Sequence, residues 1–431
     1  MTQGALRVLP TEVELAVRVQ PCLAERRTYE RADRAHPCEF FADQGSFHSY
    51  DLRADSAPPT PSTLQPVRYA GRRRIVPELL SGCRKAPIMS VGINPNLPAF
   101  WPGKHSSLQP VFDDLLQYVH HYRYRAIGKL EIEPGAYTTL LHGRTDQAAG
   151  GPELAATGTD LPVRLANQAM YEAYQGLLDG LAAAAGWTGA KLSVGEDLSY
   201  GNMVACGSPR WITRPDPKQP GLPVMTTEQR DGIVDECFSK RRYFLRQLFH
   251  SLPRVLLVFG GATRDAVATA MAGHFTAGAP KVGEDLDALL ARRVVLRYGA
   301  LPDGKELAAR VIFVPHASGN PDGFAAAKAK VIAALHDEVT AGAIGFDQKS
   351  GHLARSVGAC TFCDNAMYRI GACDYVDQLV PLARPPQAPG GEESSEEGGD
   401  GAAAILRERA AQDALLDAWT ARSGGAGGAF G

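Results

Sequence analysis

The chain has 431 residues, of which 45% are hydrophobic, so it is long enough for two or three domains with a buried core. Its formal net charge is −2, and residues 385–431 hold eight Asp or Glu against three Arg, which leaves +3 for the remainder. No stretch approaches the roughly 18 apolar residues of a membrane span, and residues 1–8 lack the charged-then-apolar pattern of a signal peptide. These features argue against a membrane partner, and we expect a monomer in the cytoplasm.

Composition divides the chain into four regions. Residues 1–75 form an N-terminal extension, and residues 76–345 alternate short apolar runs with helical patterns. Residues 346–384 contain clustered cysteines and are expected to dock on the core. Residues 385–431 form an acidic, Gly- and Ala-rich tail, which has little apolar surface to bury and is expected to be largely disordered.

Short apolar runs predict the strands of the central region, and apolar residues at helical spacing predict its helices. The expected strands are residues 88–91, 192–194, 254–259 and 310–314, and the expected helices are 230–249, 264–272, 323–335 and, in the tail, 405–419. Thr226-Thr227-Glu228 is a helix-start pattern, and Pro253 ends the first helix. Strands that alternate with helices indicate an α/β fold, a three-layer sandwich with a short central parallel sheet flanked by helices.

Three polar motifs come after apolar runs in this region. They are Gly92-Ile93-Asn94-Pro95, Asn202-Met203-Val204-Ala205-Cys206 and Pro315-His316-Ala317-Ser318-Gly319-Asn320-Pro321. Ligands of open α/β sheets bind outside the carboxyl ends of the strands, so we expect the three motifs to form one site. Taken singly, Asn94 is a turn residue before a proline, Asn202 a strand-end cap and His316 an ordinary loop histidine.

These motifs resemble those of the uracil-DNA glycosylase superfamily. The segment from Asn202 to Cys206 is similar to the Asn-x-x-x-Cys motif of the iron–sulfur branch, family 4, and Cys237 is followed by a helix, a strand and a Gly-Ala turn as in that branch. The segment that contains Asn94 looks like the first motif of the mismatch-specific relatives, and His316 falls at the His-Pro-Ser motif, with Ala in place of Pro. The resemblance covers about residues 85–340 and implies the uracil-DNA glycosylase form of the three-layer fold.

The resemblance implies a DNA glycosylase that removes uracil or a related deaminated base by hydrolysis of the N-glycosidic bond, a step of base excision repair. Such an enzyme rotates the nucleotide out of the helix and stabilises negative charge on the departing base. Asn94 would position the water, and His316 would donate a hydrogen bond to the base oxygen. Gly92 and Asn202 would bind the base, the latter through its paired donor and acceptor. Phe100 would stack on the base, although core packing is an alternative use of it.

The residues after His316 are expected to approach the DNA backbone. Ser318, Gly319 and Asn320 are small or polar, which suits a loop that contacts phosphates. An ordinary turn is the alternative reading of the same three residues.

Four cysteines are expected to hold a four-iron four-sulfur cluster, as the resemblance implies. They are Cys206, Cys237, Cys360 and Cys363, with Cys373 as a possible substitute for one of them. Four thiolates also suit a tetrahedral zinc ion, so zinc remains the alternative. In either case the metal would be structural and would tie residues 346–384 to the loop after Asn202.

Two rival functions remain open from the sequence. One is a weak or inactive glycosylase relative that binds DNA and keeps the iron–sulfur cluster, because Asn94 is a poorer base than a carboxylate. The other is a zinc-containing α/β protein that acts on a nucleotide.

Overall fold

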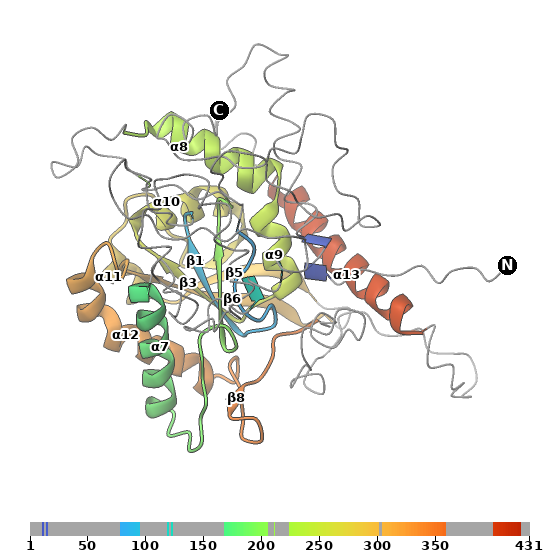
Figure 1. Cartoon of the computed structure of the whole chain (residues 1–431). Coiled ribbons are helices and arrows are strands. Elements are labelled where there is room, and N and C mark those ends of the chain that lie inside the picture. The colour runs from blue at the N-terminus through green and yellow to red at the C-terminus, as the bar shows by residue number, and fades with distance from the viewer. Residues whose placement is uncertain are drawn as a thin grey trace, which may run out of the picture.

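The computed structural model describes residues 11–12, 14–15, 78–94, 119, 122–123, 168–205, 211, 224–300, 304–358 and 400–423 (Figure 1). Several predicted site residues lie outside these ranges: Phe100, Cys206, Cys360, Cys363 and Cys373. Within the described part, the chain is an α/β protein with a six-stranded sheet flanked by helices.

The central sheet has the strand order β2-β1-β3-β6-β5-β4. The first four strands are mutually parallel: β2 (Leu198–Asn202), β1 (Ile88–Gly92), β3 (Val255–Phe259) and β6 (Glu306–Val314). Strands β5 (Val294–Ala300) and β4 (Phe275–Ala277) extend the sheet in antiparallel fashion. The predicted parallel sheet flanked by helices is confirmed for these four strands, while β5 and β4 make the whole sheet mixed, because a short connection joins β5 to β6 as a hairpin, which only antiparallel strands allow.

Helices cover both faces of the sheet, and side chains that alternate along each strand enter two separate cores. Val255, Leu257 and Phe259 pack with helices α7 (Gln168–Ala184) and α12 (Pro321–Thr340). Leu256 and Val258 pack on the opposite face with α9 (Tyr243–Ser251) and α13 (Asp400–Ser423). The remaining elements are α8 (Thr227–Val234), η3 (Asp235–Lys240), α10 (Gly261–Ala270), η4 (Ala272–His274), α11 (Leu286–Leu290), β7 (Phe346–Asp347) and β8 (His352–Leu353).

The helix predicted over 230–249 is interrupted. It begins as expected at Thr226, whose side chain forms a capping box with Gln229. Residues 235–240 then form a π-helical turn, in which the Arg241 amide bonds to the Glu236 carbonyl, and Arg242 adopts a left-handed conformation with φ 58°. An i to i−5 hydrogen bond adds one residue to the turn, and residues 235–242 contain neither Gly nor Pro, so no residue that typically ends a helix marks the interruption.

The run 192–194 is not the strand that precedes the second motif. Strand β2 lies at 198–202, and Asn202 is its last residue. Leu192 and Val194 are buried in a loop, and Val194 makes an isolated bridge with Leu198. Burial of a turn therefore produced the apolar pattern that predicted a strand there.

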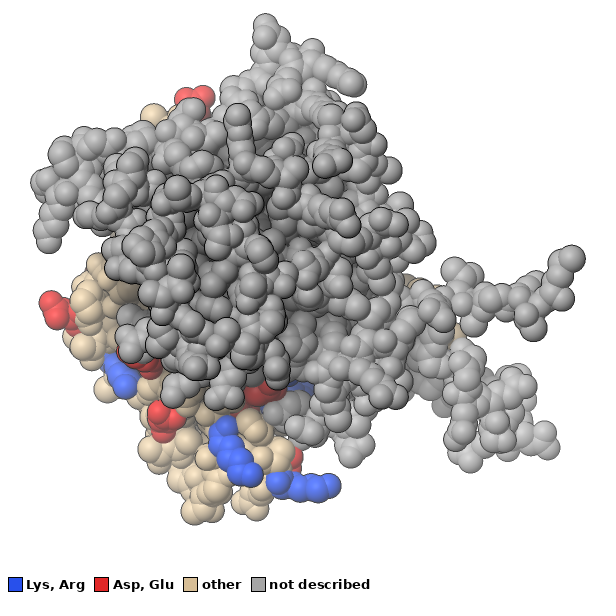
Figure 2. Space-filling view, in the orientation of Figure 1, with Lys and Arg blue, Asp and Glu red and all other residues tan. Residues whose placement is uncertain are grey.

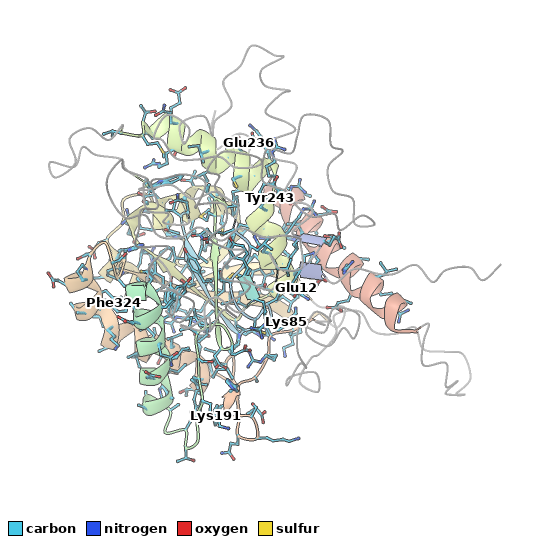
Figure 3. All side chains as sticks on the ribbon, viewed as in Figure 1. Glu12, Lys85, Lys191, Glu236, Tyr243 and Phe324 are labelled. Atoms are coloured by element: carbon cyan, nitrogen blue, oxygen red, sulfur yellow. The ribbon has the colours of Figure 1, made fainter. Side chains whose placement is uncertain are left out.

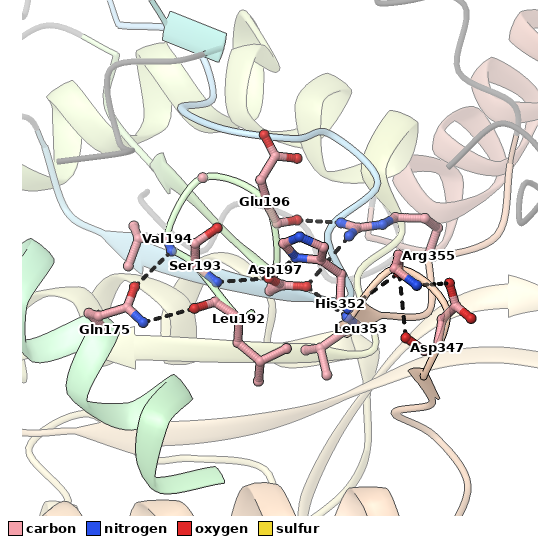
Figure 4. Close-up of polar contacts among 12 residues, drawn as sticks. Gln175, Leu192, Ser193, Val194, Glu196, Asp197, Asp347, His352, Leu353 and Arg355 are labelled. Carbon is pink, nitrogen blue, oxygen red and sulfur yellow. Dashed lines mark hydrogen bonds and ion pairs between the residues drawn. The ribbon is translucent and has the colours of Figure 1, made fainter. Parts of the chain in front are cut away.

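A buried carboxylate attaches residues 346–358 to the core. Asp197 precedes β2, is fully buried, and accepts hydrogen bonds from the Ser193 amide at 2.8 Å and the Leu353 amide at 2.7 Å (Figure 4). The ring of His352 lies 2.8 Å from Asp197 Oδ2, and the buried guanidinium of Arg355 lies 3.5 Å from Oδ1. These contacts hold β8 against the amino end of β2.

The tail is ordered where it forms helix α13, which is longer than the predicted helix over 405–419. Leu416 and Trp419 of this helix are buried in the core, and Trp419 contacts Phe249 of α9 at 5.7 Å between ring centroids. The helix predicted in the tail is therefore confirmed, since a few apolar residues on one helical face are enough to dock it. No helix in the described part of the chain has the length and apolar composition to cross a bilayer.

Candidate active site

The three polar motifs meet at one edge of the sheet. Strands β2, β1, β3 and β6 are parallel, so their carboxyl ends share an edge. Asn202 ends β2 and is paired with Gly92, the end of β1, while Gly260 follows β3 and its amide bonds to Val314 at the end of β6 at 2.8 Å. Strands β2 and β6 are three positions apart, or about 14 Å from the usual strand spacing. We call this row of strand ends, from β2 to β6, the ledge. It brings together residues that are separated by more than 200 positions in the sequence.

Asn202 is held in place by its neighbours on this ledge. Its Oδ1 accepts a hydrogen bond from the Tyr200 hydroxyl at 2.8 Å, and its Nδ2 lies 3.4 Å from Oε2 of the buried Glu78. Gly92 provides the space for this arrangement, because a Cβ there would lie 2.5 Å from Asn202 Oδ1. The amide is thus oriented before any ligand arrives, and Gly92 contributes through the absence of a side chain.

His316 lies two residues after β6, and the backbone that follows sets its tautomer. The Gly319 amide donates to His316 Nδ1 at 3.0 Å, and Ser318 Oγ lies 3.2 Å from the same nitrogen. A ring nitrogen that accepts a backbone N–H carries no proton, so the neutral ring has its hydrogen on Nε2. Burial lowers the pKa of His316, which favours this neutral form.

The structure separates the roles predicted for the loop after His316. Ser318 and Gly319 contact the imidazole, whereas Asn320 caps α12, where its Oδ1 accepts from the Gly323 amide at 3.1 Å. Asn94 is buried, two residues past the end of β1. The loop therefore organises His316 and starts a helix.

A row of aromatic rings runs along the same face of the sheet, from β2 to α12, and the sequence patterns did not single it out. Tyr200 lies 6.1 Å from Tyr174 of α7, which lies 5.1 Å from Phe259 of β3, and Phe259 lies 6.3 Å from Phe324 of α12 (Figure 3 labels Phe324). Tyr174 is buried, accepts a hydrogen bond from Ser90 at 2.8 Å, and has its pKa raised by burial. The available signal was the position of Tyr200 two residues before Asn202, on the same side of the strand.

No family model, curated protein or solved structure matches this chain. The arrangement of its own residues is therefore the basis of any functional conclusion.

One predicted metal ligand, Cys237, lies among the described residues. Cys237, in the π-helical turn, is buried, and its Sγ accepts a hydrogen bond at 3.3 Å from the amide of Ala205, the residue before Cys206. N–H donors to sulfur are typical of cysteines that bind iron–sulfur clusters. No group of three or more metal-binding side chains occurs among the described residues, which include only Cys237 of the four expected ligands.

The approach to the other predicted pair is at the opposite edge of the sheet. Residues 356 and 357 bond to Lys85, which precedes β1, and a Cβ at Gly358 would lie 2.5 Å from Lys85 Nζ. Figure 3 shows Lys85 and Glu236, the neighbour of Cys237, near opposite ends of α9. Cys360 and Cys363 follow this segment in the sequence and lie outside the described residues.

The basic cluster at 240–242 is neutralised by nearby carboxylates. Lys240 lies 3.1 Å from Asp235, Arg241 lies 2.7 Å from Glu236, and Arg242 lies 3.5 Å from an acidic residue of α13, Asp417. On the part of the surface that Figure 2 shows for described residues, basic and acidic side chains are interspersed. A phosphate that approaches this cluster must compete with the carboxylates already bound.

Proposed function

We propose that the chain is a DNA glycosylase that hydrolyses the N-glycosidic bond of uracil, or of a related deaminated base, in DNA. The observation that carries this proposal is the convergence of Gly92, Asn202 and His316 at the carboxyl edge of four parallel strands. The resemblance of their three motifs to those of the uracil-DNA glycosylase superfamily supports the same reading.

The proposed reaction begins with a nucleotide rotated out of the DNA onto the ledge. Asn202 pairs with the N3–H and O4 of uracil, and His316 donates from Nε2 to the oxygen where charge gathers as the bond from C1′ to N1 breaks. The electron pair leaves with the base, and a water held by Asn94 adds its oxygen to C1′ and releases a proton to solvent. The products are a free base and an abasic site.

Electrostatic stabilisation of the departing base is the main contribution of the site. A neutral imidazole donates to an oxyanion without a charge that would attract other anions, and its fixed tautomer requires no reorganisation during the reaction. A donor of this kind contributes about 3–4 kcal/mol to the transition state. Asn94 can orient water but is a weak base, so a slow enzyme is expected.

A structural iron–sulfur cluster is part of the proposal. Cys206 and Cys237 would supply two thiolates near the end of β2, and Cys360 and Cys363 would supply the other two, with Cys373 as the substitute for one of the four. When bound, the cluster would stabilise the segment after Asn202. The hydrogen bond from Ala205 to Cys237 supports this position.

The decisive experiment is excision from oligonucleotides that contain uracil, hypoxanthine or xanthine, followed by alkaline cleavage of abasic sites. Wild-type protein should cleave at least one of these substrates. His316→Ala should lose about 10²–10³ of the rate and keep its thermal unfolding midpoint, and Asn202→Ala should lose a similar amount of rate. The matched control is His336→Ala, which removes an imidazole near the C-terminal end of α12, the end away from His316.

Binding without turnover would favour the first rival, a glycosylase-like DNA-binding protein. In that case Asn94→Ala would leave affinity for uracil-containing DNA unchanged and no substrate would be cleaved. No cleavage of any substrate would refute the enzymatic proposal.

A further inference from the structure

We infer that Glu78 fixes the orientation of the Asn202 amide and thereby makes the site select uracil over cytosine. This inference rests on the proposed function and adds a residue that lies outside the three motifs. It follows from the two contacts of Asn202 and from the different hydrogen-bonding capacities of a carboxylate and a hydroxyl.

The two ends of the Asn202 amide meet different partners. Oδ1 faces the Tyr200 hydroxyl at 2.8 Å, and Nδ2 faces the carboxylate of Glu78 at 3.4 Å. Glu78 reaches this point because the segment before β1 runs beside β2: the Glu78 amide bonds to the Ala205 carbonyl at 2.7 Å, and Ser81 bridges to Tyr200. Glu78 is buried with Asn202, so the contact is sheltered from water.

Uracil and cytosine present opposite patterns to an amide. Uracil offers the N3–H donor and the O4 acceptor, whereas cytosine offers the N3 acceptor and the N4 amino donor. An asparagine reads uracil with Oδ1 toward N3–H and Nδ2 toward O4. To read cytosine in the same position, the amide must rotate by half a turn.

Only one of the two partners of the Asn202 amide opposes a rotation by half a turn. The Tyr200 hydroxyl donates or accepts, so it can bond to either end of the amide. An ionised carboxylate only accepts, so a rotated amide would place Oδ1 against the Glu78 oxygens, two acceptors facing each other in a buried position. Glu78 is thus the positioning residue that excludes the cytosine-reading orientation, and Tyr200 is neutral in this respect.

The test compares binding of two single-stranded oligonucleotides that differ only in one nucleotide, 2′-fluoro-2′-deoxyuridine or 2′-fluoro-2′-deoxycytidine. The fluorine slows bond cleavage, so affinity is measured apart from turnover, and the single strand removes differences in base pairing. Wild type should prefer the uracil probe by about tenfold or more, the discrimination of one bidentate pair. Glu78→Gln, which supplies a donor in the same shape, should reduce this preference about tenfold by tighter binding of the cytosine probe.

Two further variants make the result specific. Tyr200→Phe should change the preference less than threefold, and Glu306→Gln, which alters an exposed glutamate on β6, should leave it unchanged. An unchanged preference in Glu78→Gln, or an equal loss in Tyr200→Phe, would overturn the role of Glu78 while uracil excision by wild type continued. A wild type that neither cleaves nor prefers uracil would instead refute the proposed function itself.

Discussion

Gly92 shows how a single missing side chain makes room for the side chain of a neighbouring strand. Its Cα lies opposite that of Asn202 in the strand register, and a Cβ at position 92 would lie 2.5 Å from Oδ1 of Asn202. A glycine is required at position 92 because the side chain of Asn202 approaches its backbone closely.

Gly92→Ala is expected to displace the Asn202 side chain and to reduce uracil excision about 100-fold, since displacement of a reacting group by about 1 Å has this effect. The fold should persist, because the atoms that a Cβ at Gly92 would meet belong to the side chains of Asn202 and Tyr200 and not to the backbone. Gly273→Ala is the control, as no atom lies within 4 Å of a Cβ at that glycine. Full activity in Gly92→Ala would show that the amide position does not matter.

Buried histidines make the stability of this protein depend on pH. His274 stacks on Trp419 with ring centroids 3.5 Å apart, and burial, followed by the charge of Arg422, lowers its pKa to about 4. Burial also lowers the pKa of His250 and of His316. The unfolded chain binds protons near the ordinary pKa of 6.5, whereas the folded chain does not. Acid therefore favours unfolding in the window between these values.

The free energy of unfolding should accordingly fall as pH decreases from about 6.5 toward 4, by up to roughly 1.4 kcal/mol per pH unit for each such histidine. His274→Phe keeps a ring against Trp419 and removes one titrating group, so its slope should be shallower. Urea unfolding of both proteins at a series of pH values measures this. Parallel curves would contradict the assigned role of His274.

Among the secondary-structure elements, the attachment of β8 depends on a single buried carboxylate. Asp197 and Arg355 have fully buried side chains and are joined by hydrogen bonds, with further donors from two amides. A buried pair of this kind contributes little net stability, but removal of one partner leaves an uncompensated charge.

Asp197→Asn is expected to destabilise the protein by about 3 kcal/mol because Arg355 loses its counter-charge in the core. The midpoint of urea unfolding measures the loss. Asp287→Asn serves as the control: it belongs to an ion pair with Lys330 whose side chains are 66% and 61% exposed, and surface pairs contribute about 0–1 kcal/mol. If both substitutions lowered the free energy of unfolding equally, Asp197 would not be the residue that attaches β8 to the core.

Considered across the sheet, the three polar motifs lie at the carboxyl edge, and helix α13 lies on the face that α9 covers. Helix α13 pairs with α9 through Asp413 and Asp417, opposite Arg246 and Arg242. The same helix buries Trp419. Helix α13 thus contributes to the core and also places acidic side chains beside Arg242 and Arg246.

Metal content tests the ligand assignment. Protein purified without oxygen should contain about four irons and absorb near 400 nm, and Cys237→Ser should lose both signals if its thiolate binds the cluster. Cys83→Ser is the matched control, because Cys83 is also buried but lies near the amino end of β1, with its amide bonded to the Gly195 carbonyl. Stoichiometric zinc in a colourless wild type, or an equal loss in both variants, would contradict the assignment.

Local pattern was sufficient where one segment forms one element. The strand at 254–259, the Thr226 helix start and the stop at Pro253 were all predicted correctly, since a continuous apolar run, capping and proline geometry act over a few residues. The interrupted helix at 235–242 escaped prediction because that segment contains neither Gly nor Pro. The apolar run at 192–194 was wrongly predicted as a strand, because a buried loop can have the same apolar composition as a strand.

The amino-acid order alone determined that polar motifs follow apolar runs, and it predicted a site at the carboxyl edge of an α/β sheet. Tertiary structure decided which residues lie beside these motifs. Glu78 contacts Asn202, 124 positions away, and Asp197 contacts Arg355, 158 positions away, through packing of distant segments that no local pattern encodes. The physical reason is that hydrogen-bond partners in a buried site are chosen by packing of distant segments, whereas propensity and periodicity act only between near neighbours in the chain.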